Sequence, residues 1–364
     1  MLILLTICAI ILTLLVLLPY YVALHIRKYL YDKEICKSHT FEIPVISVGN
    51  ITVGGTGKTP HVEMLVSKLK ERYKLAVLSL GYKRKTKGFY IVNENDTYIK
   101  CGDEPLQIKS KFPDVIVAVC KKREVAIRKL IDEYGVNCVI LDDGLQYRKV
   151  QPSTNLLLVK YSRPINKDKV FPFGHLRDLF SQSKRVDAVI VSKSPNFAYE
   201  DGNEYDYLAQ ERTAVEEVKW RKDLKLRDDQ RLFFSIQVFS SPLPIFPNLE
   251  NRRYIYSKFA ICFSGIASDK EFISQLAMNY CVEGNLKFAD HRQFSKSDIA
   301  RIVKMAQKQP EAVIITTEKD SMRIKDNKWL PDEIKTRMFY LPVSCKIIPQ
   351  KKMDELIEIT QTKK

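Results

Sequence analysis

The stretch that decides the fold is Val45-Ile-Ser-Val-Gly-Asn-Ile-Thr-Val-Gly-Gly-Thr-Gly-Lys-Thr-Pro60. It joins an apolar, strand-like run to a glycine-rich turn and then to the start of a helical pattern. Glycine backbones allow N–H groups to curl around phosphate oxygens, and the helix that follows offers unpaired N–H groups and the positive end of its dipole. The stretch therefore predicts a phosphate-binding loop with these residues: Thr52, Val53, Gly54, Gly55, Thr56, Gly57, Lys58 and Thr59.

Two side chains give this loop its chemistry, and two positions depart from the common pattern. Lys58 can reach terminal phosphates, and the Thr59 hydroxyl can ligate Mg²⁺. Thr52 stands where the first glycine of the motif is usual, and Val53 stands where one dimeric ATPase subclass has a lysine. The order of strand, loop, Lys-Thr and helix favours a nucleotide site over a chance glycine turn.

Acidic residues follow a second apolar run, Cys138–Leu141, as Asp142-Asp143-Gly144. A carboxylate at the carboxyl end of a neighbouring parallel strand can hold Mg²⁺ directly or through water. The alternative is a simple strand-end turn, since Asp-Gly favours turns. The motif Gly174-His-Leu-Arg-Asp178 can add a guanidinium for phosphate and a carboxylate for metal. The expected metal ligands are Thr59, Asp142, Asp143 and Asp178.

Four other motifs are ambiguous when each is taken alone. Cys101-Gly-Asp-Glu-Pro105 is typical of a turn or a helix start, and Phe288-Ala-Asp-His-Arg-Gln-Phe294 holds one of only five histidines. Lys83–Lys87 is either a solvated basic loop or an anion-binding loop. Thr317-Glu-Lys-Asp320 indicates only a loop after a strand.

Apolar, β-rich runs alternate with helix-like stretches, which predicts mostly parallel sheets covered on both faces. The strand runs are Ile43–Val48, Leu75–Leu80, Val115–Val119, Cys138–Leu141, Leu156–Val159, Ala188–Val191, Phe259–Phe263, Ala312–Thr316 and Met338–Val343. A charged stretch, Pro195–Gln230, and the alternating run Leu232–Phe239 mark a boundary. We expect two α/β/α sandwich domains, a P-loop NTPase-like core over residues 26–195 and a smaller α/β domain over 257–364, joined by a β-strand linker over 196–256.

The composition of the 364 residues, with 45% hydrophobic and 28% charged, excludes wholesale disorder and fibrous structure. The net charge of +16 predicts an anionic partner. Eight scattered cysteines without Cys-x-x-Cys spacing disfavour zinc-ribbon, iron–sulfur and thioredoxin-like sites and indicate free thiols in a reducing compartment.

The N-terminal run from Leu2 to Leu24 carries no charge and is long enough to cross a hydrocarbon core about 30 Å thick. Arg27, Lys28 and Lys33 follow it, and basic flanks stay cytoplasmic. Residues 1–25 are therefore expected to form a single membrane helix with the catalytic body on the cytoplasmic face. The alternatives are a cleaved signal peptide, which would need a basic n-region that this chain lacks, and a buried core helix.

In this order, the motifs resemble those of the tetraacyldisaccharide 4′-kinase (lipid A 4′-kinase) family. The matching motifs lie between Gly49 and Asp320 and include the phosphate loop, Gly-Asp-Glu-Pro, Asp-Asp-Gly-Leu-Gln, Gly-His-Leu-Arg-Asp, Asp-His-Arg and Thr-Glu-Lys-Asp. The resemblance implies a kinase at the cytoplasmic face of the inner membrane that uses ATP and Mg²⁺. Its acceptor would be the 4′-hydroxyl of a tetraacylated glucosamine disaccharide 1-phosphate, giving lipid IVA. It implies contact with anionic membrane lipids, no nucleic acid and no obligate protein partner.

The resemblance also implies residue roles. Asp103 and His291 would be the catalytic pair, brought together by closure of the cleft between the two domains. The substrate-binding residues would be Tyr82, Lys83, Arg84, Glu104, Gln146 and Arg177. Three positions depart from the family pattern, with Leu80 in place of an arginine, Arg292 in place of a second histidine and Asp178 in place of a glutamate.

Two other classes of function remain open from the sequence. A membrane-anchored P-loop NTPase acting as a switch or motor would hydrolyse ATP without a lipid acceptor. A nucleic-acid-binding protein is suggested by charge alone and is disfavoured, because the basic residues are spread along the chain and no recognised module is present.

Overall fold

The computed structural model describes residues 19–197, 207–247, 254 and 256–361. Its contacts divide the chain into two compact units, and each unit is assembled from separated segments. The first unit comprises Met1–Lys58, Arg123–Ile236 and Ile347–Lys364, and the second comprises Thr59–Lys122 and Gln237–Lys346. The domain boundaries at residues 26–195, 196–256 and 257–364 stay a prediction.

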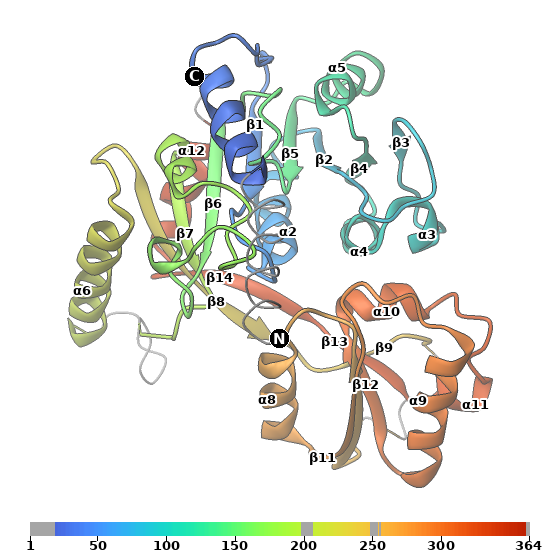
Figure 1. Cartoon of the computed structure of the whole chain (residues 1–364). Helices are drawn as coiled ribbons and strands as arrows, with labels where there is room; N and C mark the ends of the chain where they lie inside the picture. Colours follow the sequence, from blue (N-terminus) through green and yellow to red (C-terminus); the bar gives the residue numbers. More distant parts are fainter. Residues whose placement is uncertain (1–18, 198–206, 248–253, 255, 362–364) are drawn as a thin grey trace, which may run out of the picture. The chain divides into compact units, whose positions relative to one another are not determined.

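The first unit is built on parallel strands in the order β8-β7-β6-β1-β5 (Figure 1). Their bounds are β1 Val45–Gly49, β5 Cys138–Asp142, β6 Thr154–Lys160, β7 Ala188–Ser192 and β8 Arg231–Phe239. Because β1 lies between β5 and β6, the loop that follows its carboxyl end begins between the carboxyl ends of these two strands. Val48 of β1 lies opposite Asp142 of β5. The phosphate loop and the acidic pair therefore start at the same edge.

Helices of the first unit are α5 Arg123–Tyr134, α6 Tyr207–Leu224 and α12 Lys352–Gln361, with 3₁₀ turns at Ile165–Lys167 and Phe180–Arg185. The helix α6 was not expected, because its sequence is dense in charge and poor in aliphatic clusters. Trp220 and Leu224 nevertheless join the core cluster that also contains Leu157, Val189 and Phe234. These two apolar residues attach this polar helix to the core, and ion pairs and hydrogen bonds such as Lys352–Glu217 and Tyr161–Glu216 add to the attachment.

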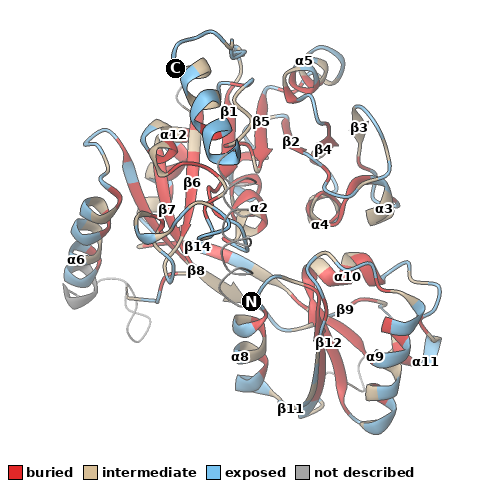
Figure 2. Cartoon of the chain, in the orientation of Figure 1, coloured by how far each residue is buried: buried red, intermediate tan, exposed pale blue. Residues whose placement is uncertain are grey.

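In the second unit, strands β2 Leu75–Ser79, β4 Ile116–Val119 and β3 Tyr90–Ile91 lie side by side. β2 and β4 are parallel, and β3 is antiparallel to β4. The helix α2 Lys58–Leu69 precedes β2, and the helices α3 Tyr98–Cys101 and α4 Asp103–Lys111 lie between β3 and β4 in the chain. The strands β2 and β4 are buried along almost their whole length, which accounts for their continuous apolar runs, whereas both residues of β3 are only partly buried (Figure 2).

A five-stranded sheet completes the second unit, in the order β11-β10-β12-β13-β9. Alternate residues of β10 and β12 feed two separate clusters, as the period of two in a strand requires. Ile261, Phe263 and Ile314 pack with Ile302 of α9, whereas Cys262 and Ile315 pack in the other cluster, with Phe272 of α8. The bounds are β9 Leu243–Pro244, β10 Phe259–Ser264, α8 Lys270–Asn279, β11 Cys281–Lys287, α9 Lys296–Lys308, β12 Val313–Thr317, α10 Glu318–Ile324, α11 Asp332–Lys335 and β13 Met338–Leu341. The strand β14 Val343–Ile348 follows β13 but is not part of this sheet, and it lies beside β8.

The prediction of an α/β fold with parallel strands is confirmed. Most of the expected membrane helix, residues 1–25, lies outside the described residues. From residue 19 onward the chain is helical to residue 32. None of the helices in the described part of the chain combines the length and the apolar character that spanning a bilayer requires. All seven cysteines among the described residues are free thiols.

Candidate active site

The phosphate loop leaves β1 and leads into α2, as the sequence predicts. Gly54 and Gly57 have φ angles of 99° and 84°, in the left-handed region where a side chain would add strain. A Cβ atom built on Gly54 or Gly55 meets nothing within 4 Å, so the loop borders open space. The buried Asn50 amide donates to the Thr56 hydroxyl at 2.9 Å and holds the turn from inside.

The motif Gly174–Asp178 runs beside this loop. The Val53 N–H donates to the His175 carbonyl at 2.7 Å, and the Arg177 N–H donates to the Ile51 carbonyl at 2.8 Å. Thr52 forms an antiparallel bridge with Leu176. The threonine that replaces the usual first glycine is therefore held by backbone pairing.

The acidic pair at the end of β5 is held by two arginines. Arg123 donates to the main-chain carbonyls of Asp143 at 2.9 Å and Asp142 at 3.0 Å. The guanidinium of Arg177 pairs with the Asp143 carboxylate, and Lys58 Nζ lies 3.9 Å from it. Burial alone would raise the pKa of Asp143, but the charges of Lys58 and Arg177 outweigh it and lower this pKa. Asp143 is therefore ionised at neutral pH.

The predicted metal ligands are oxygen donors at the edge where the phosphate loop begins, or in the first turn of α2. Asp142 is the last residue of β5, and Thr59 is the second residue of α2. Asp178 is buried and accepts the Leu179 N–H at 2.8 Å. Among the residues that the structure describes, no group of three or more His, Cys, Asp and Glu side chains is arranged to hold a metal ion. Mg²⁺ commonly takes only one or two carboxylates and completes its shell with phosphate and water, so Asp142 and Asp178 fit such an ion.

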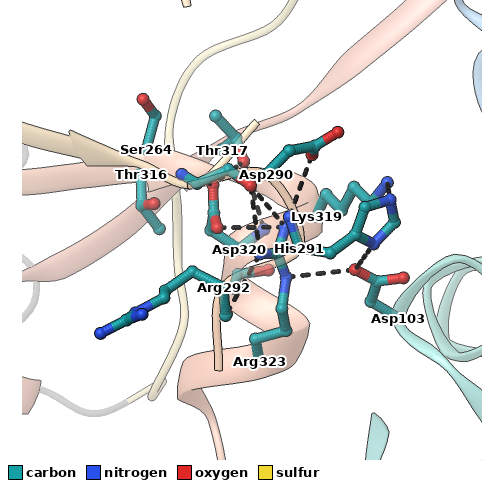
Figure 3. A network of polar contacts seen from close by, with 12 residues as sticks. Asp103, Ser264, Asp290, His291, Arg292, Thr316, Thr317, Lys319, Asp320 and Arg323 are labelled. Atoms are coloured by element: carbon teal, nitrogen blue, oxygen red, sulfur yellow. Dashed lines mark hydrogen bonds and ion pairs between the residues drawn. The ribbon is translucent and has the colours of Figure 1, made fainter. Parts of the chain in front are cut away.

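Asp103 and His291 are in contact within the second unit (Figure 3). The Asp103 carboxylate is 4% exposed, and its Oδ2 lies 3.1 Å from His291 Nδ1 and 3.1 Å from Arg323 Nε. Asp103 is the first residue of α4, directly after Gly102, whose φ is 99°. Sequence reasoning expected domain closure to bring this pair together. In this structure the pair is already assembled.

Lys319 determines which nitrogen of His291 carries the proton. Its Nζ lies 3.1 Å from His291 Nε2 and 2.8 Å from Glu104 Oε1. Burial alone would lower the pKa of Lys319, but the charges of Glu104 and Asp103 outweigh it and raise this pKa. An ammonium can only donate, so Nε2 accepts. The Nδ1 atom then carries the proton and donates it to Asp103.

The same neighbours set the charge of Asp103. Burial alone would raise the pKa of its carboxyl, but the hydrogen bond with His291 and the charges of Lys319 and Arg323 outweigh it and lower the pKa. Asp103 is therefore a carboxylate at neutral pH and can accept a hydrogen bond from a hydroxyl group.

The predicted substrate-binding residues divide between the two units. Near His291, the Tyr82 ring lies 4.8 Å away in an edge-on contact, and Lys83 Nζ is 3.5 Å from the His291 carbonyl. In the first unit, the Gln146 amide donates to the main-chain carbonyl of Asn50, beside the phosphate loop.

Arg84 forms its hydrogen bonds within its own loop, and its substrate-binding role stays a prediction. Its guanidinium donates to the Thr86 hydroxyl at 3.2 Å and to the Gly88 carbonyl. Leu80, which stands where the family has an arginine, is 42% exposed. Arg292 pairs with Asp298 of α9, with Nε and Oδ2 2.9 Å apart.

Backbone strain points to the same residues. Among the described residues, six non-glycine residues have positive φ, and three of them, Lys83, Asp143 and His291, are predicted site residues. A bulky side chain at positive φ costs free energy and persists where the surrounding structure imposes it. The strain is therefore concentrated in this site.

Three charged residues of the site escaped prediction: Arg123, Lys319 and Arg323. The last two lie in α10, which begins where only a loop was expected. Thr317 caps this helix by accepting the Asp320 N–H, at 3.2 Å. A threonine followed three residues later by an acid is a helix-start signal that was available in the sequence.

Comparisons with known proteins identify the family of this chain. The family model described as Tetraacyldisaccharide-1-P 4′-kinase matches residues 8–361. A tetraacyldisaccharide 4′-kinase of Porphyromonas gingivalis is 38% identical over 357 residues, covering 95% of this chain and 96% of that protein. One of Flavobacterium johnsoniae is 36% identical over 329 residues, covering 89% and 88%.

A solved structure is also similar to the chain as a whole. The structure of LpxK from Aquifex aeolicus in complex with ATP is 26% identical in sequence, with a TM-score of 0.69. The match covers 96% of this chain and 99% of that one. From the match along nearly its whole length, this chain belongs to the tetraacyldisaccharide-1-P 4′-kinase family.

Proposed function

We propose that the chain transfers the γ-phosphate of ATP to the 4′-hydroxyl of a tetraacylated glucosamine disaccharide 1-phosphate, with Asp103 as the group that receives the hydroxyl proton. Family membership makes the chain an ATP-using kinase of lipid A biosynthesis. Asp103 is chosen because its carboxylate lies 3.1 Å from His291. The nearby charges of Lys319 and Arg323 lower its pKa and keep it ionised.

The low pKa of Asp103 indicates how it works. Phosphoryl transfer passes through a loose transition state, in which the attacking hydroxyl keeps its proton until late. A weakly basic carboxylate suits this task, because it orients the hydroxyl early and takes the proton once the new bond to phosphorus has formed. His291 holds the carboxylate through Nδ1 and Lys319 holds His291, so these two residues are positioning groups.

The first unit supplies the phosphate chemistry in this proposal. Lys58 and the amides of the loop neutralise and orient the triphosphate. Asp142 and Asp178, with the Thr59 hydroxyl, would hold Mg²⁺, which would neutralise charge on the phosphates. Asp143, which contacts Arg177 and Lys58, orients these two cations toward the nucleotide.

The acceptor's acyl chains make a membrane location part of the proposal, with a single N-terminal helix and the catalytic body on the cytoplasmic face. Two features of the first unit support it. The helix over residues 19–32 exposes Tyr21, Ile26 and Tyr29. The loop before Gly174 exposes Phe171 and Phe173. The Tyr20 hydroxyl donates to the Arg177 carbonyl at 2.9 Å, which joins the two features. Anionic lipids attract surface Lys and Arg by about 1 kcal/mol each.

The test is turnover with labelled ATP and the lipid disaccharide, using the full-length protein. Asp103→Ala is expected to lower kcat by about 10² or more, with ATP binding retained. Asp132→Asn, an exposed carboxylate on α5, serves as the matched control and is expected to leave kcat unchanged. Wild-type turnover in Asp103→Ala would remove Asp103 from the proposed role.

The same assay tests the competing function of an NTPase switch or motor. Such a protein would hydrolyse ATP at the same rate with and without the acceptor. The proposed kinase is expected to consume ATP at an appreciable rate only when the lipid is present, and to give a phosphorylated lipid product.

A further inference from the structure

Three helices of the second unit begin at residues of the proposed site. The first turn of α2 carries Thr59, α4 begins at Asp103, and α10 begins with Glu318 and Lys319. The reaction depends on how these three first turns are placed relative to one another, because a misplacement of about 1 Å costs on the order of 100-fold in rate. Contacts that fix the relative positions of α2, α4 and α10 are therefore expected to affect the reaction rate.

One buried cluster joins all three helices, and it lies outside the catalytic contacts. Lys111, the last residue of α4, places its Nζ 2.7 Å from Glu63 Oε2 of α2 and 2.7 Å from Glu318 Oε1 of α10. The side chains of Glu63 and Glu318 are 6% and 2% exposed. The Gln107 amide, one turn earlier in α4, donates to Glu63 Oε1 at 2.8 Å. Through these two ion pairs, one side chain links all three helices.

The cluster places two acids beside one ammonium, and its geometry is demanding because both acids are almost fully shielded from water. The Lys111 ammonium is shared by two buried acids, Glu63 and Glu318, so it ties both α2 and α10 to α4. A buried charge that loses its partner is strongly destabilising. The cluster therefore favours one relative placement of α2, α4 and α10 over others that would separate the charges.

We infer that Lys111 is a positioning residue for phosphoryl transfer, which holds the first turns of α2, α4 and α10 in their productive arrangement. The inference rests on the proposed function, because it takes Asp103 and Lys319 as parts of the reaction site. Lys111 itself does not contact Asp103 or His291 in any recorded hydrogen bond or ion pair. Its effect on rate would be exerted through the helices alone.

The experiment compares variants of the full-length enzyme by kcat per folded molecule and by KM for ATP. Lys111→Met removes the ammonium but leaves two unpaired acids and can fail to fold. The triple variant Lys111→Met, Glu63→Gln, Glu318→Gln removes all three charges and keeps the approximate shape of each side chain. It therefore tests how the three helices are positioned without leaving two acids to repel each other. Lys111→Arg keeps the charge. Lys129→Met, which loses a solvent-exposed pair with Glu133 on α5, is the matched control.

The triple variant is expected to lose about 10-fold to 100-fold in kcat per folded molecule. Its KM for ATP is expected to stay within about threefold, because nucleotide contacts remain. Lys111→Arg is expected to keep most of the activity, and Lys129→Met all of it. Amides of the first turn of α4 should exchange hydrogen faster in the triple variant.

A triple variant with wild-type kcat per folded molecule would overturn the inference and leave Lys111 a purely structural residue. A KM for ATP that rises as much as kcat falls would overturn it as well, because the loss would then be one of binding. Asp103→Asn is measured in the same series. Full activity in that variant would reject the proposed role of Asp103. The rates of the Lys111 and Lys129 variants would still show, by themselves, whether Lys111 affects turnover.

Discussion

At the scale of single residues, the reaction site of the second unit is a set of charges around one carboxylate. Asp103 is buried between His291 and Arg323, and Lys319 fixes the tautomer of His291 from its other side. The cations lower the pKa of Asp103, and burial opposes them. The side chain is therefore anionic when the acceptor arrives, and its role is to orient the hydroxyl and collect its proton.

Lys319→Met is expected to lower kcat about 10-fold to 100-fold, since a lost charge-assisted hydrogen bond is worth roughly 1.5–3 kcal/mol. Without the ammonium, either nitrogen of His291 can carry the proton, and Nδ1 no longer always donates to Asp103. Lys319→Arg should recover part of the rate. Lys335→Met is the control, because Lys335 is a partly exposed lysine that pairs with Asp332 and lies outside the proposed site. Equal kcat in the methionine variant and wild type would contradict the tautomer assignment.

Glu63 gives the chain a measurable pH dependence of stability. Burial raises its pKa to about 7, and Glu318 adds to this, although Lys111 opposes it. The folded state therefore binds a proton more tightly than the unfolded state, whose ordinary pKa is 4.5. The stability that this proton contributes is present below pH 4.5 and is lost as the pH rises to about 7 and beyond.

Glu63→Gln removes this titration. Between pH 4.5 and 7 the wild type is therefore expected to lose free energy of unfolding relative to the Glu63→Gln variant. Urea unfolding of both proteins at pH 5 and at pH 8 measures the difference. Other acids titrate equally in the two proteins and cancel. A difference that is the same at both pH values would show that Glu63 is ionised throughout.

At the scale of elements, the site depends on where helices begin. The acidic first residue of α4 follows Gly102 at φ 99°, a conformation that residues with a Cβ rarely adopt. The first turn of α10 is held by the Thr317 cap. A helix start is a suitable place for a reactive side chain, because its backbone is rigid while its side chain is free to face a ligand.

Gly102→Ala is expected to lower the free energy of unfolding by about 1 kcal/mol or more, because alanine disfavours positive φ. It should also lower kcat, since Asp103 is the next residue. Gly135→Ala is the matched control, because Gly135 has a φ of 61° after α5 and lies outside the proposed site. Thermal unfolding and kcat separate the two effects. Similar kcat values in the two variants would show that the turn at Gly102 does not position Asp103.

At the scale of the whole molecule, the two compact units carry different parts of the chemistry. The first unit holds the phosphate loop as far as Lys58, the acidic pair and Arg177. The second holds Asp103, His291 and Lys319. Each half is preassembled by contacts within its own unit. The family's reaction requires both halves, so the chain is expected to be active only as an intact protein.

Membrane contact through the first unit is also tested at this scale. Phe173 is 66% exposed, so Phe173→Ser should leave the fold intact but reduce binding to vesicles that contain phosphatidylglycerol. It should raise KM for the lipid acceptor without changing KM for ATP. Val218→Ser, at an equally exposed apolar position of α6, is the control. Unchanged vesicle binding in Phe173→Ser would exclude the loop from the membrane surface.

The local parts of this protein could be predicted from its sequence. The phosphate loop, its flanking strand and helix, and the acid pair after Cys138–Leu141 all depend on neighbouring residues, whose pattern is visible along the chain. Most strand positions followed from short apolar runs. The helix α6 did not, because a charged sequence became helical through the packing of Trp220 and Leu224. Tertiary contacts there overrode a weak local signal.

The sequence by itself determined the parallel α/β fold, the phosphate loop and the identity of Asp103 and His291 as candidates, since each rests on local pattern or motif order. Only the tertiary structure decided which groups meet. Asp103 and His291 lie 188 positions apart, and nothing in either motif indicates that Lys319 fixes the imidazole. Contacts between distant segments depend on the packing of whole helices and strands, and that information is not contained in any short stretch of chain.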